Sequence, residues 1–168
     1  MPKTIHQRLD EGQNIHKAVY NTRKSWEKFV TRLKTRFERM LEYPYSFLIT
    51  FTIAPEYYEL NKKTYIRKIK EALGGASEWV FNEDYGTENG RLHFHALASF
   101  TEQIDYTIIE NIYKYGSVDF LEVKNKNEKA LREYILKLIN HSLKNSASTI
   151  FRSRPPKIER EEVLLWNP

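Results

Sequence analysis

Two histidines, His93 and His95, occupy alternate positions in a short apolar run that reads RLHFHAL from Arg91. Side chains two residues apart on a strand point to the same face, so both imidazoles leave one side of a predicted strand. Two imidazoles on an open sheet face can chelate one divalent cation. The same spacing is also typical of two exposed histidines on an amphipathic strand, so it indicates a metal site only in company with a further ligand.

A carboxylate in the preceding run supplies that ligand. If Tyr85 pairs with Arg91 across a turn-rich loop, Glu83 lies opposite His93 and on the same face. A shift of one residue in the hairpin register substitutes Asp84 for Glu83, and both remain open. Two imidazoles and one carboxylate leave positions for water and a phosphate oxygen. This donor set favours Mg²⁺ or Mn²⁺ over a closed structural zinc site.

A tyrosine on the last predicted helix, Glu128–Leu143, could act as a nucleophile. Tyr134, Lys137 and His141 share a stripe at the edge of the apolar face of this helix. From there the Tyr134 hydroxyl could reach the sheet, and Lys137 could stabilise the phenolate or neutralise phosphate charge. The alternative is a boundary tyrosine beside a surface lysine, a common arrangement on amphipathic helices.

The elements that must position these residues follow from periodicity, caps and turns. The sequence predicts helices at Ser25–Leu41, from Asn61 to Gly74, at Glu102–Tyr113 and at Glu128–Leu143, and strands at Tyr45–Ile53, Glu78–Tyr85, Arg91–Ser99 and Ser117–Val123. From Tyr45 the order is βαββαβ plus a final helix. This order predicts an α+β fold, ferredoxin-like or RRM-like, with an antiparallel sheet, helices on one face and the other face free for a ligand.

The predicted domain organisation has three parts. Residues 1–44 form a basic helical extension, residues 45–145 the catalytic domain with the helix that bears the tyrosine, and residues 146–168 an irregular tail. With no cysteine, the 168 residues cannot form a disulfide scaffold, a thiolate zinc site or a cysteine nucleophile. No apolar run is long enough to cross a membrane and the N-terminus lacks the apolar segment of a signal peptide, so a cytoplasmic protein is expected.

The net charge of +5 is unevenly distributed. Residues 1–46 carry ten basic and five acidic side chains, residues 47–129 ten and thirteen, and residues 130–168 seven and four. Basic flanks indicate a polyanionic partner, and an acidic middle can hold a divalent cation. The eleven Tyr, nine Phe and three Trp could include stacking platforms for unpaired bases.

Three motifs in this order resemble those of the HUH endonucleases, specifically the nicking domain of rolling-circle replication initiators (Rep proteins) of small plasmids and single-stranded DNA viruses. The first is the strand FLITFT at Phe47–Thr52, the second GRLHFH at Gly90–His95, and the third YILK at Tyr134–Lys137. A passage before the third motif, YKYGSV at Tyr113–Val118, is also similar to the family. The matched region extends from about Phe47 to Lys144.

The resemblance implies a metal-assisted nick in single-stranded DNA, within an origin hairpin. His93 and His95, with Glu83 or Asp84, would hold Mg²⁺ or Mn²⁺ against the scissile phosphate. Tyr134 would attack that phosphate, forming a 5′-phosphotyrosine bond and releasing a 3′-hydroxyl that primes synthesis, and the reverse reaction would rejoin the strand.

Further roles follow from the same resemblance. Lys137 would help to position Tyr134 or to balance its charge. DNA contacts are implied for four residues: Thr50, Thr52, Arg91 and His141. Replication proteins of the plasmid's or virus's host are the implied protein partners.

Two other functions fit parts of the pattern. A single-tyrosine transposase also carries a His-x-His motif, but it usually has Gln a turn after the tyrosine, where this chain has Lys137. A non-catalytic RRM-like module has the same order of elements and binds RNA through aromatic residues on its central strands. In this sequence histidines stand at those positions.

Overall fold

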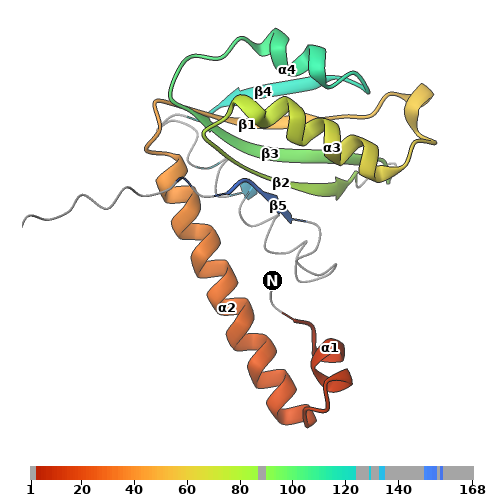
Figure 1. The fold of residues 1–168 in the computed structure, drawn as a ribbon, viewed down its shortest axis with the longest axis vertical. Coiled ribbons are helices and arrows are strands. Elements are labelled where there is room, and N and C mark those ends of the chain that lie inside the picture. The colour runs from red at the N-terminus through yellow and green to blue at the C-terminus, as the bar shows by residue number, and fades with distance from the viewer. Residues whose placement is uncertain are drawn as a thin grey trace, which may run out of the picture.

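The computed structural model describes residues 3–86, 90–123, 129, 133–134, 150–154 and 156. The helices and strands of these residues are α1 (Ile5–Asp10), α2 (Ile15–Met40), β1 (Tyr45–Phe51), α3 (Lys62–Ala72), β2 (Glu78–Tyr85), β3 (Leu92–Phe100), α4 (Tyr106–Ile112), β4 (Val118–Glu122) and β5 (Ile150–Arg152). Figure 1 shows a central sheet with α3 and α4 against it and the long α2 running away from it past the β5 edge.

The sheet has five strands in the order β4-β1-β3-β2-β5, and every neighbouring pair is antiparallel. The first four strands have the predicted ferredoxin-like arrangement, with β1 and β3 in the centre. The fifth strand was not predicted, because residues 146–168 were expected to be irregular. Instead, Phe151 pairs with Phe81 of β2, and the two rings stack at 4.8 Å.

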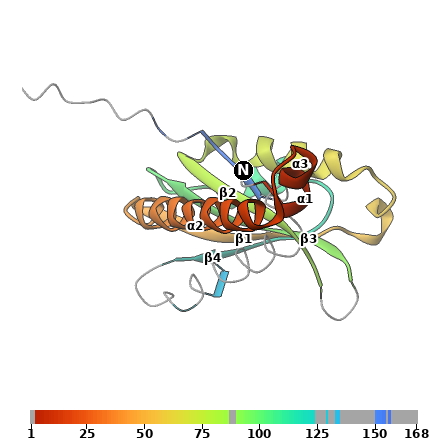
Figure 2. The same cartoon turned by 90° about the horizontal axis from the view of Figure 1, so that it is seen from below.

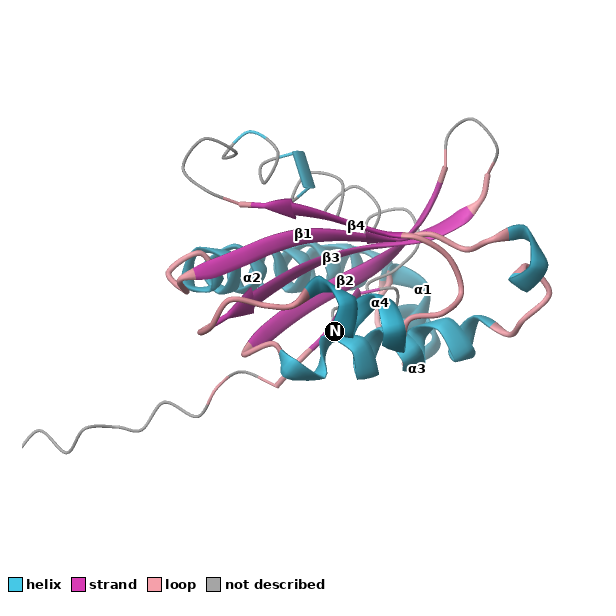
Figure 3. Cartoon of the chain, turned by 90° about the horizontal axis from the view of Figure 1, so that it is seen from above, coloured by secondary structure: helices cyan, strands magenta, loops and turns pink. Residues whose placement is uncertain are grey.

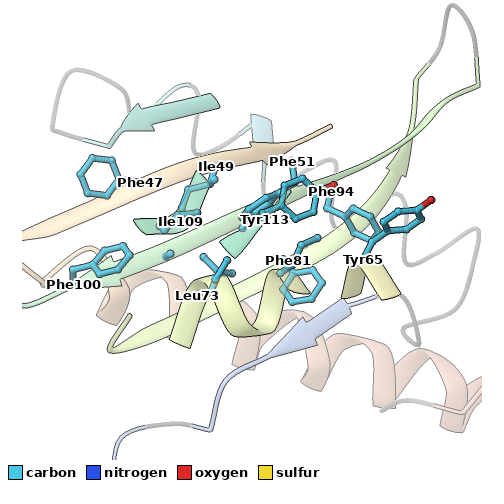
Figure 4. Packing of buried hydrophobic residues seen from close by; sticks show 14 residues of the cluster. Phe47, Ile49, Phe51, Tyr65, Leu73, Phe81, Phe94, Phe100, Ile109 and Tyr113 are labelled. Carbon is cyan, nitrogen blue, oxygen red and sulfur yellow. The ribbon is translucent and has the colours of Figure 1, made fainter. Parts of the chain in front are cut away.

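The larger hydrophobic core lies between the sheet and the helices α3 and α4. Figure 4 labels ten of its buried side chains: Phe47, Ile49, Phe51, Tyr65, Leu73, Phe81, Phe94, Phe100, Ile109 and Tyr113. Alternate residues of β1 and β3 contribute to it, as expected for strands with one face on a core. Asn61 caps α3 as predicted, since its side chain accepts a hydrogen bond from the Lys63 amide. This face of the sheet is therefore sealed by aromatic packing.

The opposite face, predicted to be free for a ligand, is covered in part by α2. A second cluster joins α2 to the sheet and to Tyr134: Phe29, Leu33, Phe37, Met40, Val80, Leu97, Tyr134 and Ile150. A partly buried ion pair fixes the same end of α2, because Arg39 donates to the fully buried Glu78 at 3.1 Å. In Figures 2 and 3, α3 and the short helical segment at 133–134 lie on opposite sides of the sheet.

Two helices start several residues away from the predicted positions. α2 begins at Ile15 rather than Ser25, because the Asn14 side chain accepts a hydrogen bond from the Lys17 amide and caps the helix there. α4 begins at Tyr106 rather than Glu102, because Asp105 is its cap. Most of the predicted helix Glu128–Leu143 lies outside the described residues. Among the helices that are described, none is long and apolar enough to cross a membrane.

Candidate functional site

The β2–β3 hairpin determines which carboxylate joins the two histidines. The predicted register, with Tyr85 opposite Arg91, is wrong by one residue, because Tyr85 pairs with Leu92 and Asp84 pairs with His93. The pairing continues one residue further along the first strand than expected, since the Gly86 amide donates a hydrogen bond to the Arg91 carbonyl at 2.9 Å. A shift of one residue exchanges the two faces of a strand.

The three side chains that converge at this end of the sheet are therefore Asp84, His93 and His95. Asp84 Oδ2 lies 3.3 Å from His95 Nε2 and 3.6 Å from His93 Nε2. One ligand atom from each residue lies within 4.8 Å of the other two, and all three side chains are partly exposed. The two imidazole rings stand edge to face at 4.8 Å.

The Nδ1 atom of each imidazole lies within hydrogen-bond distance of a neighbouring oxygen. His93 Nδ1 lies 3.1 Å from the Arg91 carbonyl, which can only accept, so in the neutral imidazole Nδ1 is the donor and Nε2 has the lone pair. His95 Nδ1 lies 3.2 Å from the Thr50 hydroxyl, which can accept from it in the same way. Outer contacts of this kind orient metal-binding histidines and fix their tautomers. Both Nε2 atoms are thus directed towards Asp84.

The donor set fits a divalent cation of the Mg²⁺ or Mn²⁺ type. Two imidazole nitrogens and one carboxylate oxygen converge from a single face, and their solvent-exposed side leaves further coordination positions open. A closed tetrahedral zinc site would need a fourth protein ligand, and no such residue joins the group among the described part of the chain.

Glu83, the first choice from sequence, points to the other face. Its carboxylate pairs with Lys62 at the start of α3, at 2.8 Å, and its side chain is 7% exposed. This pairing raises the pKa of the Lys62 ammonium, chiefly through the hydrogen bond from Lys62 to Glu83. Glu83 therefore ties α3 to β2 instead of facing the histidines.

Tyr134 lies on the same face as the histidines, and it is buried rather than at the predicted edge of the apolar face. Its side chain packs edge-on against Phe37 of α2, with ring centroids 6.2 Å apart, and its ring centroid lies 6.5 Å from that of His95. The hydroxyl donates to the His95 carbonyl at 3.0 Å. Burial raises the pKa of the Tyr134 phenol above its ordinary value. A hydrogen bond with the Leu97 backbone lowers this pKa, but by less than burial raises it.

A groove of about 240 Å³ runs from His95 across β1 to β4. Its lining includes Leu48, Thr50, His95, Asp119, Leu121 and Tyr134. Asp119 pairs with Thr50 across the β1–β4 ladder, and Leu121 is 47% exposed on the same face of β4. Sequence analysis did not single out Asp119 or Leu121. Their positions two apart on β4, opposite the first motif, are the signal that could have found them.

The remaining predicted residues divide into three groups. Thr50 contacts His95 and lines the groove. Thr52 lies beyond the end of β1, where its hydroxyl bonds to Ser117 at 2.7 Å, and the Arg91 guanidinium lies 5.5 Å from the centre of the Tyr58 ring. Lys137 and His141 lie outside the described residues. The structure thus brings Asp84, His93, His95, Thr50 and Tyr134 together on one face.

Comparison with known proteins adds little to this site. No family model matches the chain, and no curated protein matches it. Among solved structures, it is similar to the hypothetical protein ORF119 from Sulfolobus islandicus rod-shaped virus 1, with 22% sequence identity and a TM-score of 0.47. That similarity covers 63% of this chain and 92% of the viral one. A similarity at this level shows nothing about the activity of this chain.

Proposed function

We propose that this protein is a metal-dependent endonuclease and strand transferase that nicks single-stranded DNA through Tyr134, as a replication initiator of the rolling-circle type. The observation that carries the proposal is the convergence of Asp84, His93 and His95 on the face that also holds the Tyr134 hydroxyl. The resemblance of the three sequence motifs supports the same function.

Each residue of the site has a role in this reaction. Asp84, His93 and His95 would hold Mg²⁺ or Mn²⁺ at the exposed end of the hairpin. When bound, such a cation polarises a non-bridging oxygen of the scissile phosphate and holds the phosphate for in-line attack. Thr50 would keep the lone pair of His95 directed at the site. The groove from His95 to β4 would take the DNA strand beside the reacting phosphate.

Tyr134 would form the covalent intermediate. Its oxygen attacks the phosphorus, the bond from phosphorus to the 3′ oxygen breaks, and the phosphate remains on the tyrosine as a 5′ ester. The phenol proton is released to solvent, and the departing 3′ oxygen takes up a proton to give a free hydroxyl. Because the ester is retained, a later 3′-hydroxyl can reverse the step and rejoin the strand.

Tyr134 would have to move before that step. The hydroxyl is bonded to the His95 carbonyl and shielded by Phe37, so it must give up this hydrogen bond to reach a phosphate at the histidines. A rotation of the side chain towards Nε2 of His95 would keep it on the same face. Entry of DNA into the groove beside Tyr134 would cause that rotation.

An adduct assay tests the proposal. The wild type is incubated with a randomised, labelled single-stranded DNA pool and Mn²⁺, with EDTA as the metal-free control, and is run on a denaturing gel. We expect a shifted band that needs both Mn²⁺ and Tyr134 and is absent in Tyr134→Phe. The matched control is Tyr113→Phe, which removes a buried hydroxyl from the opposite face and should leave the band unchanged.

Other results would assign a different function. A band that persists in Tyr134→Phe would keep the chemistry and reject the nucleophile. DNA or RNA binding that is independent of metal, with no adduct from any pool, would favour the non-catalytic RRM-like module. Sequences trapped from the pool would separate an origin-type site from the target of a transposase.

A further inference from the structure

The outer side of α2 carries a row of cations that the proposed nicking site does not use. Lys17, Lys24, Lys28 and Arg32 follow one another at intervals of seven, four and four residues, and all four are exposed. At 3.6 residues per turn they fall within about 80° of the helix circumference, over a length of about 22 Å. We call these four residues the α2 cationic row.

The basic residues of α2 are divided between two functions. Near the end of the helix, Arg36 and Arg39 form ion pairs with the buried Glu78 and attach α2 to the sheet. Across the described residues, no ion pair involves any member of the α2 cationic row. Glu27, the acidic residue within this span, is paired with Arg23 on another flank of the helix, at 3.1 Å.

Short polar side chains fill the space between the cations. Thr31 and Thr35 donate their hydroxyls to main-chain carbonyls of α2 itself, and Asn21 donates to Gln13. One exposed ring lies beside the α2 cationic row, since the Lys24 ammonium is 5.7 Å from the centre of the Tyr20 ring. A single ring does not form the series of aromatic platforms on which successive single-stranded bases stack. It also provides little of the apolar area that a protein or membrane partner would cover.

We propose that the α2 cationic row binds the sugar-phosphate backbone of duplex DNA. A straight helix presents its cations at fixed intervals, and duplex DNA presents a stiff row of phosphates, with one negative charge per about 1.7 Å of axis. The row extends the proposed function, since a duplex next to the nicked strand would lie along α2, but binding to it requires neither the metal nor Tyr134.

The test is the salt dependence of duplex binding, measured with EDTA present so that no nicking occurs. The probe is a blunt duplex of about 20 base pairs, and log K is plotted against log salt concentration. Each lost phosphate contact lowers the magnitude of the slope by about 0.9, so Lys24→Gln with Lys28→Gln should lower it by about 1.8. The matched control is Arg23→Gln with Lys34→Gln, which removes the same charge from another side of α2 and should leave the slope nearly unchanged.

The outcomes distinguish this proposal from the nicking reaction. Equal slope changes in the two double variants, or none in either, would overturn the α2 cationic row as a duplex site. Binding of the wild type to phosphatidylserine vesicles without affinity for the duplex would assign the row to a membrane surface and also overturn it. Adduct formation on a short single strand should be unaffected by Lys24→Gln and Lys28→Gln, whereas Tyr134→Phe should abolish adducts and leave the duplex slope intact.

Discussion

Two neighbouring carboxylates of β2, Glu83 and Asp84, lie on opposite faces of the sheet and have different surroundings. Glu83 faces α3, is almost fully buried and is neutralised by Lys62. Asp84 faces the other way, is partly exposed, and has two imidazole nitrogens within 3.6 Å but no Lys or Arg partner among the described residues. The same type of side chain is a structural tie on one face and a candidate ligand on the other.

The difference follows from what covers each face. On one side α3 and α4 pack on the sheet through Tyr65, Ile69 and Ile109, and the strand residues beneath them form the larger core. On the other side α2 covers only the part near Val80 and Leu97, and the hairpin end beyond it stays polar. Because residues alternate along a strand, Phe94 belongs to the sealed face while His93 and His95 belong to the open end. Substitutions on the sealed face can therefore change the stability of the fold without changing the histidines, and substitutions of the histidines can change the chemistry without changing the core.

The largest effect should separate the two faces by stability. Phe94→Ala removes a fully buried ring that packs against Tyr65 and Phe81, and we expect a loss of about 3–5 kcal/mol in the free energy of unfolding. His93→Ala, one residue away, should change it by less than about 1 kcal/mol. Urea unfolding followed by circular dichroism measures both. Similar losses in the two variants would mean that the histidine face is part of the core.

An intermediate effect should come from the outer contact of His95. Thr50→Val keeps the shape of the side chain and removes the hydroxyl that lies 3.2 Å from Nδ1, so the affinity for Mn²⁺ should fall about 10–100-fold. Thr50→Ser should restore most of it. Thr52→Val removes a hydroxyl bonded to Ser117 instead and serves as the control. Calorimetric titration with Mn²⁺ is the measurement, and equal losses for Thr50→Val and Thr52→Val would reject Thr50 as a positioning residue.

The smallest effect concerns a tyrosine of the sealed face at alkaline pH. Burial raises the pKa of the Tyr113 phenol, and its hydroxyl donates to the Thr52 carbonyl. At pH above about 10 the unfolded chain loses the phenol proton of Tyr113, whereas the folded state keeps it. The contribution of this group to the free energy of unfolding is therefore full below about pH 10 and decreases as the pH rises above it. One proton accounts for about 1.4 kcal/mol per pH unit. Urea unfolding at about pH 9, 10 and 11 should show a shallower decline in Tyr113→Phe, and an identical decline would contradict the assignment.

Much of the fold was predictable because its signals are local. The alternation of apolar residues in β1 and β3 and the Asn61 cap are properties of short segments, and they led to the ferredoxin-like order. The fifth strand was missed because Ile150–Arg152 is only three residues long, and what makes it a strand is its pairing with β2. The start of α2 at Ile15 was missed because Thr22 and Ser25 interrupt the apolar face of the helix, although Asn14 is a recognisable cap.

The site was predictable in its residue types but not in its register. The two histidines share a face in any register, so their alternation was sufficient to group them. The choice between Glu83 and Asp84 depends on how the loop after Tyr85 closes. That is decided by the bond from the Gly86 amide to the Arg91 carbonyl and by Gly90, whose φ of 64° suits glycine. Neither feature leaves a periodic pattern in the sequence.

The metal centre is tested most directly by Mn²⁺ binding to three proteins, followed by electron paramagnetic resonance of the free ion. We predict that the wild type binds one Mn²⁺, that Glu83→Gln binds it equally well, and that Asp84→Asn loses more than about 100-fold in affinity, beyond what an outer contact would cost. Both substitutions keep the size of the side chain and remove one charge, on opposite faces of the same strand. Loss of binding in Glu83→Gln with retention in Asp84→Asn, or no binding by the wild type, would contradict a metal centre at Asp84, His93 and His95.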